Sequence, residues 1–362
     1  MRQVTLFMDN FSEKTVGGEM KKLVIVMRAL IFFMVGILLF LFLSPLFVPK
    51  TGNSKKGFYR AIIQGFYDEP ENSLDAIFIG ESSIYKSISP IEMWKEHGFT
   101  SYDFASPGQK IWDSYYCMKE ALKYQKPKVI ILNADQAFDA KPLSKFFKSH
   151  LYDNMPLSMN KIEAVMDPVQ KNTTEEIASY LFPIFKYHSR WSELDEEDFK
   201  MANENYHYAK KGYVLIKKKK AYKGNNNYLQ KEDKNNKITP ESEEYLLKIK
   251  ELCQENGIPL LLLEMPAPKV WNKTKQQEMT KWAVKNNVAF LDLNKVVSEM
   301  GIDWKTDTSD KGIHMNIYGA KKVTKYVGNY LKENYSLPDH RNNPNYQQWK
   351  QDQEEYEKAC NI

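Results

Sequence analysis

Apolar residues occur mostly in short runs separated by polar positions, but one stretch near the start stays apolar for much longer. Residues 23–48 read LVIVMRALIFFMVGILLFLFLSPLFV, and residues 29–48 carry no charge. A run of about 20 such residues forms a helix about 30 Å long, which matches the core of a bilayer. The run has no polar face, so a helix on the surface of a soluble domain is disfavoured. We therefore expect a membrane-spanning helix over 23–48.

This apolar segment has two possible fates. Lys21, Lys22 and Arg28 would suit the positive start of a cleaved signal peptide. The run is longer than a usual signal core, and no small-residue cleavage site follows Val48. An uncleaved anchor is favoured, with residues 1–22 in the cytoplasm and the chain from about 50 onward outside the cytoplasmic membrane. Translation can start at Met1 or at Met20, which begins MKKLVIVMRAL.

After a linker over 49–73, the pattern alternates between short apolar runs and helical periodicity, which is typical of a parallel α/β sheet. Strands are expected at Ala76–Gly80, Ser101–Ala105, 128–134, 258–264 and 289–293, with helices at Pro90–His97, Ile111–Tyr124, 241–255, 273–287 and 318–334. The alternation lapses over 138–238, where helical pieces predict a largely helical insertion. We expect a three-layer, doubly wound parallel sheet over 74–334 and a peripheral polar tail over 335–362.

The charge balance and the cysteine count argue against several classes of protein. The chain has 362 residues, 51 Lys and Arg against 46 Asp and Glu, and a net charge of +5, which is too even to indicate a nucleic-acid binder. Its three cysteines, Cys117, Cys253 and Cys360, are too few and too widely spaced for a disulfide framework or a Cys-ligated metal site. We expect no metal, no other cofactor and no nucleic-acid partner.

Candidate chemistry lies where ligands gather in such sheets, at the carboxyl ends of strands. Gly80-Glu81-Ser82-Ser83 follows the first strand, where a serine can expose its hydroxyl beside a free backbone amide. Taken alone, this serine is more often a helix cap. Near the last helix, Asp310 and His314 lie in one loop, where the histidine can accept a serine proton and the aspartate can orient it.

These motifs, in this order, resemble the SGNH/GDSL hydrolase superfamily over about 74–334. Gly80-Glu81-Ser82 matches its first block, Gly108 in DFASPGQ its second, and Asp310 with His314 its last. The resemblance implies Ser82 as nucleophile, His314 as base and Asp310 as the orienting carboxylate. It also implies the amides of Ser82 and Gly108 as donors to an oxyanion.

Two positions depart from the family pattern. Three residues separate Asp310 from His314, where the family has two, so Asp307 remains a rival. The third strand ends in Leu-Asn-Ala-Asp, without the family's glycine before the asparagine. Asn133 can therefore be an oxyanion donor, or can lie within the sheet edge or cap a turn.

Longer phrases such as IFIGESSIYKSISP and GIHMNIYGAKKVTKY resemble a membrane-anchored branch from Gram-positive bacteria. That branch is similar in layout to DltD of D-alanyl-lipoteichoic acid biosynthesis and to the extracytoplasmic proteins of polysaccharide O-acetylation. The resemblance implies two partners, a cell-envelope glycopolymer such as teichoic acid or a polysaccharide, and a polytopic membrane-bound O-acyltransferase.

Two further stretches have competing interpretations. His188 and Arg190, in FKYHSRW, are candidates for substrate binding, or else belong to a packed aromatic cluster. The lysines at 217–220 can attract a polyanion, although a solvated loop is the commoner reason for such a run. The leading hypothesis is an anchored serine esterase or O-acyltransferase. The alternative is a noncatalytic scaffold that binds polymer or recruits the transmembrane acyltransferase. The sequence does not separate acyl transfer from hydrolysis.

Overall fold

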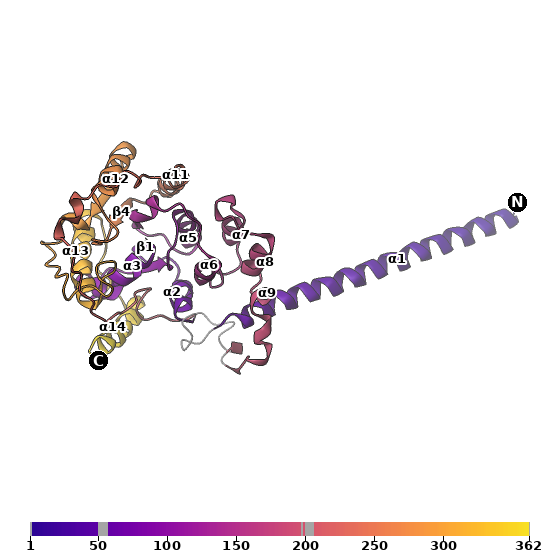
Figure 1. Ribbon diagram of the computed structural model, residues 1–362. Helices are drawn as coiled ribbons and strands as arrows, with labels where there is room; N and C mark the ends of the chain where they lie inside the picture. Colours follow the sequence, from indigo (N-terminus) through magenta and orange to yellow (C-terminus); the bar gives the residue numbers. More distant parts are fainter. Residues whose placement is uncertain (1, 50–56, 197, 200–205, 362) are drawn as a thin grey trace. The chain divides into compact units, whose positions relative to one another are not determined.

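The computed structural model describes residues 2–49, 57–196, 198–199 and 206–361 (Figure 1). It divides into two compact units. The first comprises Met1–Val48 with Phe182–Ala202, and the second comprises Pro49–Leu181 with Asn203–Ile362. Each unit is described by itself below.

The second unit is built on five parallel strands, which confirms the predicted fold class. The strands are β1 Ala76–Gly80, β2 Ser101–Ala105, β3 Val129–Asn133, β4 Leu260–Glu264 and β5 Ala289–Asp292, in the spatial order β2-β1-β3-β4-β5. This is the flavodoxin-like doubly wound order. Because the sheet is covered on both faces, strands such as AIFIG and VIILN are buried at every position and apolar nearly throughout.

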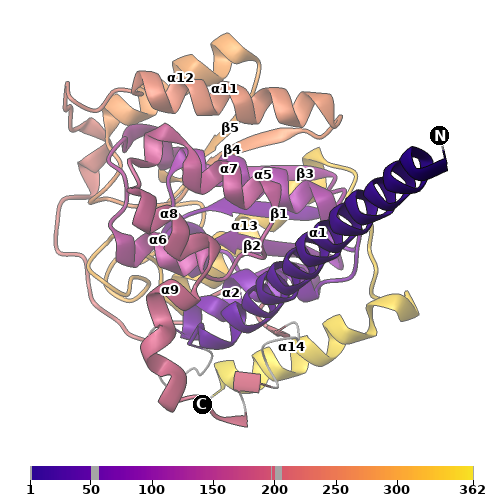
Figure 2. The same cartoon turned by 90° about the vertical axis from the view of Figure 1, so that its right-hand side faces the viewer.

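Helices cover the sheet in two layers (Figure 2). Helix α5 (Ile111–Tyr124) packs with α11 (Pro240–Glu255) on one face, and α12 (Lys273–Asn286) lies beside β5. On the other face α13 (Ile317–Asn334) packs with α3 (Ser82–Ser87) and α4 (Pro90–His97). The connection between β3 and β4 carries α6 (Lys145–Tyr152), α7 (Met159–Met166) and α8 (Thr174–Leu181), so its first part is helical as predicted, whereas residues 206–225 form no helix. The 3-10 turns of this unit are η2 Ala134–Phe138, η3 Pro168–Gln170, η5 Asn226–Gln230, η6 Leu293–Lys295 and η7 Pro344–Tyr346.

Two segments that the sequence assigned to the periphery belong to the core instead. The predicted linker contains helix α2 (Gly57–Asp68), whose Ile62, Ile63 and Phe66 are buried. The predicted tail contains α14 (Gln347–Cys360), which buries Trp349 and Tyr356 against the core. Helix α14 is polar on average and α2 is mostly apolar, but each has an apolar face, and burying that face is what holds them on the domain.

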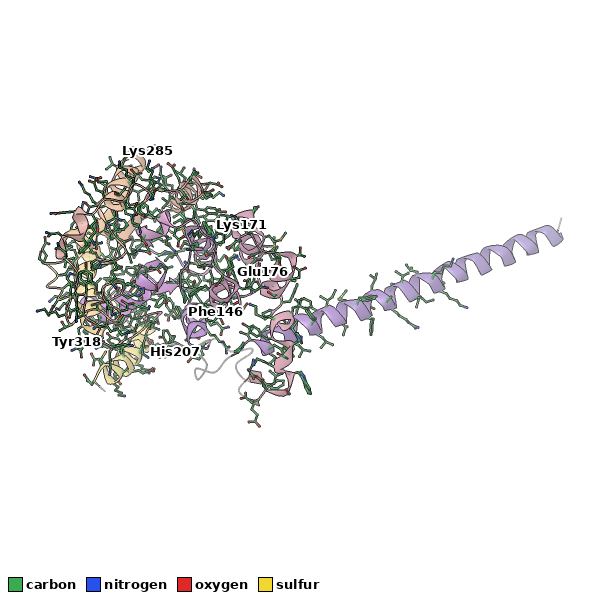
Figure 3. All side chains as sticks on the ribbon, in the orientation of Figure 1. Phe146, Lys171, Glu176, His207, Lys285 and Tyr318 are labelled. Atoms are coloured by element: carbon green, nitrogen blue, oxygen red, sulfur yellow. The ribbon has the colours of Figure 1, made fainter. Side chains whose placement is uncertain are left out.

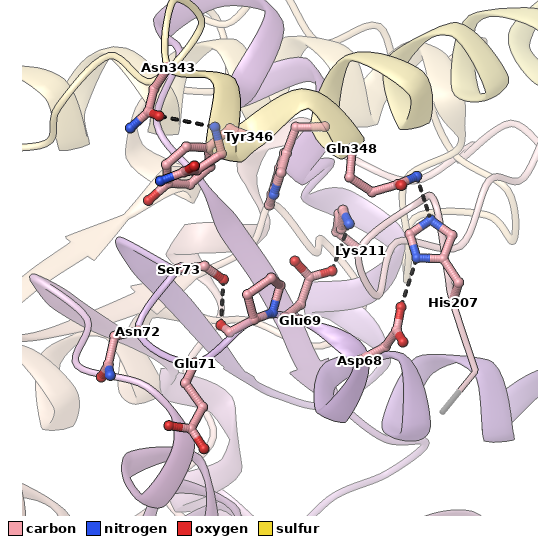
Figure 4. A pocket seen from close by; sticks show the side chains of 13 residues that line it. Asp68, Glu69, Glu71, Asn72, Ser73, His207, Lys211, Asn343, Tyr346 and Gln348 are labelled. Atoms are coloured by element: carbon pink, nitrogen blue, oxygen red, sulfur yellow. Dashed lines mark hydrogen bonds and ion pairs between the residues drawn. The ribbon is translucent and has the colours of Figure 1, made fainter. Parts of the chain in front are cut away.

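A buried ion-pair network joins these two helices. Lys211 lies 2.6 Å from Glu69 and 2.6 Å from Asp352, and its ammonium lies 4.8 Å from the centre of the Trp349 ring. His207 bridges the same helices, with Nδ1 2.8 Å from Asp68 and Nε2 2.7 Å from Asp352. The network borders an open cavity of about 650 Å³ (Figure 4). The carboxyl-terminal helix is therefore fixed by charge as well as by apolar packing.

The first unit consists of the amino-terminal helix and a short helical segment. Helix α1 (Arg2–Leu43) continues into the 3-10 turn η1 (Ser44–Phe47), and α9 (Ile184–Tyr187) continues into η4 (His188–Ser192). Within the described residues, Met20–Phe47 is the one stretch long and apolar enough to cross a membrane. Its length and composition fit either an anchor or a signal sequence near the amino terminus.

Candidate active site

The turn after β1 presents Ser82 at the carboxyl edge of the sheet. Gly80 ends the strand where a Cβ atom would lie 2.7 Å from the Cβ of Asn133 and 2.7 Å from Cγ1 of Ile84, so only glycine fits without displacement. Glu81 caps helix α3, because its carboxylate accepts from the Ser83 amide at 3.0 Å. The close packing and the cap together fix the position of Ser82 at the first residue of the helix.

The structure brings Ser82, His314 and Asp310 together in one relay, although 232 positions separate the serine from the histidine. The Oγ atom of Ser82 lies 2.7 Å from Nε2 of His314, and Nδ1 of His314 lies 2.5 Å from Oδ2 of Asp310. Since an ionised carboxylate can only accept, Nδ1 donates to Asp310 and leaves Nε2 as the acceptor for the serine proton. This is the order of groups that a serine nucleophile requires.

The loop that carries His314 is held by its own hydrogen bonds. Asp310 Oδ1 accepts from the His314 amide at 2.8 Å, and Thr308 Oγ1 accepts from the Gly312 amide at 2.8 Å. Lys311 and Gly312 have φ values of 70° and 91°, in the left-handed region. These two turned residues make room for the extra residue between Asp310 and His314, so the longer spacing still places the carboxylate against the ring.

The rival aspartate serves another purpose. Asp307 lies 2.7 Å from Lys322 of α13 and accepts from the Asp303 amide at 2.8 Å. The side chain is buried at 2% exposure. Asp307 thus ties the loop to α13, and Asp310 is the aspartate that contacts the imidazole ring.

Two charged residues beside the relay did not emerge from the sequence. Glu81 Oε2 accepts from the Ser82 hydroxyl at 2.8 Å, so two acceptors flank one hydroxyl proton. Burial would raise the pKa of Glu81, but the charge of His314 and the hydrogen bonds from Ser82 and Ser83 lower it. Lys86 Nζ lies 3.4 Å from Nδ1 of His314, and burial lowers the pKa of Lys86 against the opposing charges of Asp310 and Glu81. The sequence did contain a signal for Lys86. It is four residues after Ser82 on α3, and residues four apart on a helix lie on the same face.

The three expected oxyanion donors are not equally available. Within the described residues, no hydrogen bond uses the backbone amide of Ser82 or of Gly108, whose φ is 64°. Asn133 is fully buried, donates from Nδ2 to Glu264 at 3.3 Å and accepts from the Ser83 hydroxyl at 3.2 Å. One of the two protons on Nδ2 is therefore directed to Glu264 at the sheet edge, and the other remains the donor that an oxyanion could use.

A basic strap, defined as residues 210–223, borders the relay loop. The Lys220 amide donates to the Thr308 carbonyl at 2.9 Å, and the Lys311 amide donates to the Lys220 carbonyl at 3.0 Å. The side chains of Lys218, Lys219 and Lys220 are exposed. Lys219 Nζ lies 4.1 Å from the ring centre of Tyr318, which is labelled at the surface in Figure 3. The lysine run is thus a solvated loop, as expected, and its backbone is tied to the relay loop through Thr308 and Lys311.

His188 and Arg190 lie in the first unit, whereas the relay lies in the second. Arg190 donates to the Phe47 carbonyl at 2.8 Å and forms an ion pair with Asp198 at 3.0 Å. His188 is exposed on η4. The contacts of Arg190 are those of a residue that fixes its segment to the end of the amino-terminal helix. Among the described residues, no group of three or more His, Cys, Asp or Glu side chains could hold a metal ion.

No family model matches the sequence, and no curated protein matches it. Two solved structures align with most of the chain. One is a provisionally assigned acylhydrolase from Bacteroides fragilis NCTC 9343, with a TM-score of 0.36, 12% identity, and coverage of 77% of this chain and 98% of the other. The second is a GDSL-like lipase from Bacteroides thetaiotaomicron VPI-5482, with a TM-score of 0.35, 11% identity, and coverage of 76% and 97%. Likeness at this level carries no argument about the chemistry of the site.

Proposed function

We propose that this chain is a membrane-anchored serine esterase or O-acyltransferase that acts outside the cytoplasmic membrane on acyl groups of a cell-envelope polymer. One observation carries the proposal, the continuous relay from Ser82 through His314 to Asp310. Serine esters are formed by this set of groups in unrelated folds, so the geometry supports acyl chemistry directly.

In the first half-reaction, Ser82 Oγ attacks the acyl carbonyl carbon while its proton passes to Nε2 of His314. The charge that develops on the carbonyl oxygen is met by the backbone amides of Ser82 and Gly108. Collapse of this tetrahedral species breaks the bond to the leaving group, which takes the proton from His314. In the second half-reaction, an acceptor hydroxyl or water gives its proton to His314 and attacks the acyl-serine. The bond to Ser82 Oγ then breaks, and Oγ takes the proton back from His314.

The surroundings of the relay favour a large and negatively charged substrate. Lys218, Lys219 and Lys220 are exposed along one border, and Lys311 is exposed on the relay loop. Such a row of ammonium groups attracts polyanions, and it can contact several anionic groups of one polymer chain at once. Teichoic acid fits this charge, and a polytopic membrane-bound O-acyltransferase is the partner we propose for supply of the acyl group.

The test compares two neighbouring serines. Hydrolysis of an aryl acetate is measured with the full chain in detergent micelles, using wild type, Ser82→Ala and Ser83→Ala. We expect Ser82→Ala to lose about 10³-fold or more of kcat/KM. Ser83→Ala removes a hydroxyl that donates to Asn133 and does not contact His314, and it should stay within a few-fold of wild type.

The noncatalytic scaffold makes the opposite prediction. Equal turnover by wild type and Ser82→Ala, together with unchanged polymer acylation in cells carrying Ser82→Ala, would contradict the enzyme. Adding a polyol acceptor separates the two enzymatic outcomes, since a transferase forms the acylated polyol and an esterase releases the free acid.

A further inference from the structure

The segment 182–199 is fixed to the carboxyl-terminal end of the apolar helix. Rings of Phe182 and Phe185 each lie 5.4 Å from the ring of Phe40 in α1. The Ile184 amide donates to the Ser44 hydroxyl at 3.2 Å, and Arg190 donates to the Phe47 carbonyl. These contacts all lie within the first unit, so the position of the segment along α1 is set by aromatic packing and by hydrogen bonds.

The same segment exposes large aromatic side chains to its surroundings. Phe185 is 56% exposed, Trp191 is 73% exposed and Phe199 is 56% exposed. A folded domain in water seldom leaves so many aromatic rings open in so short a stretch. Lys186 and Arg190 lie among them, but acidic residues at 193 and 195–198 make the segment net acidic, so its fit to the headgroup level rests on the aromatic rings.

The contacts with α1 indicate how deep this segment would lie in a bilayer. Residues 20–39 of the span are exposed, so their apolar surface is available to lipid, whereas Ser44 and Leu46 near its end are buried. Seven positions separate Phe40 from Phe47, which is about 10 Å along a helix axis. Phe182 and Phe185 therefore reach about 10 Å below the end of the span, and Arg190, which binds the Phe47 carbonyl, marks that end.

We propose that residues 182–196 and 198–199 form an interfacial collar, which lies in the headgroup region of the bilayer where α1 emerges and whose partner is lipid. Phe182 and Phe185 enter the outer part of the hydrocarbon, and Trp191 lies at its boundary. The collar limits the depth and tilt of α1 and so holds the chain at a fixed level on the membrane. The collar rests on the proposed function in one respect, because it requires that α1 is not cleaved off. Mass spectrometry of the amino terminus of the membrane-bound protein tests this.

The experiment uses the full chain in vesicles of phosphatidylcholine and phosphatidylglycerol. In a Cys360→Ser background, Trp191→Cys is labelled with an environment-sensitive fluorophore, while the buried Cys117 and Cys253 stay unlabelled. The control is Val284→Cys on α12, an apolar residue of similar exposure at 78%. We expect a blue shift and strong quenching by nitroxide lipids at position 191, and quenching by aqueous iodide at position 284.

Equal access of iodide to both positions would overturn the collar. Protection of position 191 only when a second membrane protein is added would overturn lipid as the partner.

The native tryptophan gives a measurement that needs no cysteine. Brominated lipids should quench part of the wild-type fluorescence, and Trp191→Phe should remove that part because the other six tryptophans lie in the second unit. Quenching that persists in Trp191→Phe would contradict the proposal. Neither measurement depends on catalysis.

Discussion

Two aspartates precede His314, and the structure places one of them against its imidazole ring. Asp310 contacts Nδ1, whereas Asp307 bonds to Lys322 and the Asp303 amide. Burial would raise the pKa of Asp310, but the hydrogen bond and charge of His314 lower it. Because this pKa is depressed, the stabilisation from the pair is present at neutral pH and is lost as the pH falls through it.

This difference predicts opposite effects for two matched substitutions. Asp310→Asn should lower kcat by about 10³ to 10⁴, because an amide no longer holds the ring in the required tautomer. Asp307→Asn should keep kcat within a few-fold and lower the thermal midpoint, since it breaks the ion pair between the buried Asp307 and the partly exposed Lys322. Ester hydrolysis and thermal unfolding of both variants test this. A larger loss of kcat in Asp307→Asn than in Asp310→Asn would reverse the assignment.

The sequence predicted the position of some site residues better than that of others. Ser82 and His314 follow from motif and chain order, and the family resemblance favoured Asp310 without removing Asp307. That choice depends on the positive φ of Lys311 and Gly312, which a spacing rule does not contain. Asn133 was ambiguous for a similar reason, because its orientation depends on Glu264, which is 131 positions away.

At the scale of elements, helix α14 depends on charges that respond to pH. Hydrogen bonds from the His207 ring to the carboxylates of Asp352 and Asp68 raise the pKa of His207 from 6.5 to about 9, against the opposing effects of burial and of Lys211. The hydrogen bond to Asp352 is the largest of these effects. A raised histidine pKa stabilises the fold fully below the ordinary value, and this contribution is lost as the pH rises through the folded value.

The free energy of unfolding should therefore fall as the pH rises from about 6.5 to about 9. His207→Gln should flatten this dependence, because glutamine does not titrate. Chemical denaturation at several pH values across this window measures the effect. His188→Gln, which changes an exposed histidine of the first unit, serves as the control and should keep the wild-type slope. A slope unchanged in His207→Gln would contradict the role of this bridge.

The strands were predictable because buried parallel strands are short runs that stay apolar nearly throughout, and these runs agree with the observed bounds to within two residues. Helix α14 was missed because its average composition is polar, whereas α2 is mostly apolar and was missed although its helical periodicity was present. Their patterns held the information, with Ile62, Ile63 and Phe66 on one face of α2. In α14, Trp349, Asp352 and Tyr356 share one face, which the ion-pair network then buries.

At the scale of the whole molecule, the doubly wound sheet is what makes a relay possible. Ser82 follows β1, and His314 precedes α13, which packs on α3. Sheet order brings these distant segments to one edge, and the basic strap closes one border of that edge. The amino-terminal unit supplies the proposed attachment to the membrane, so catalysis and anchoring are predicted to fail independently when either unit is changed.

Reaction of the full chain with a fluorophosphonate probe tests the central proposal most directly, because such probes react with a serine only when a neighbouring base activates it. Mass spectrometry of the labelled peptides locates the adduct. We expect it on Ser82 in wild type and in Ser83→Ala, and we expect labelling to be lost in Ser82→Ala and strongly slowed in His314→Ala. Equal labelling of wild type and Ser82→Ala, or no labelling of wild type, would contradict an activated serine at this site.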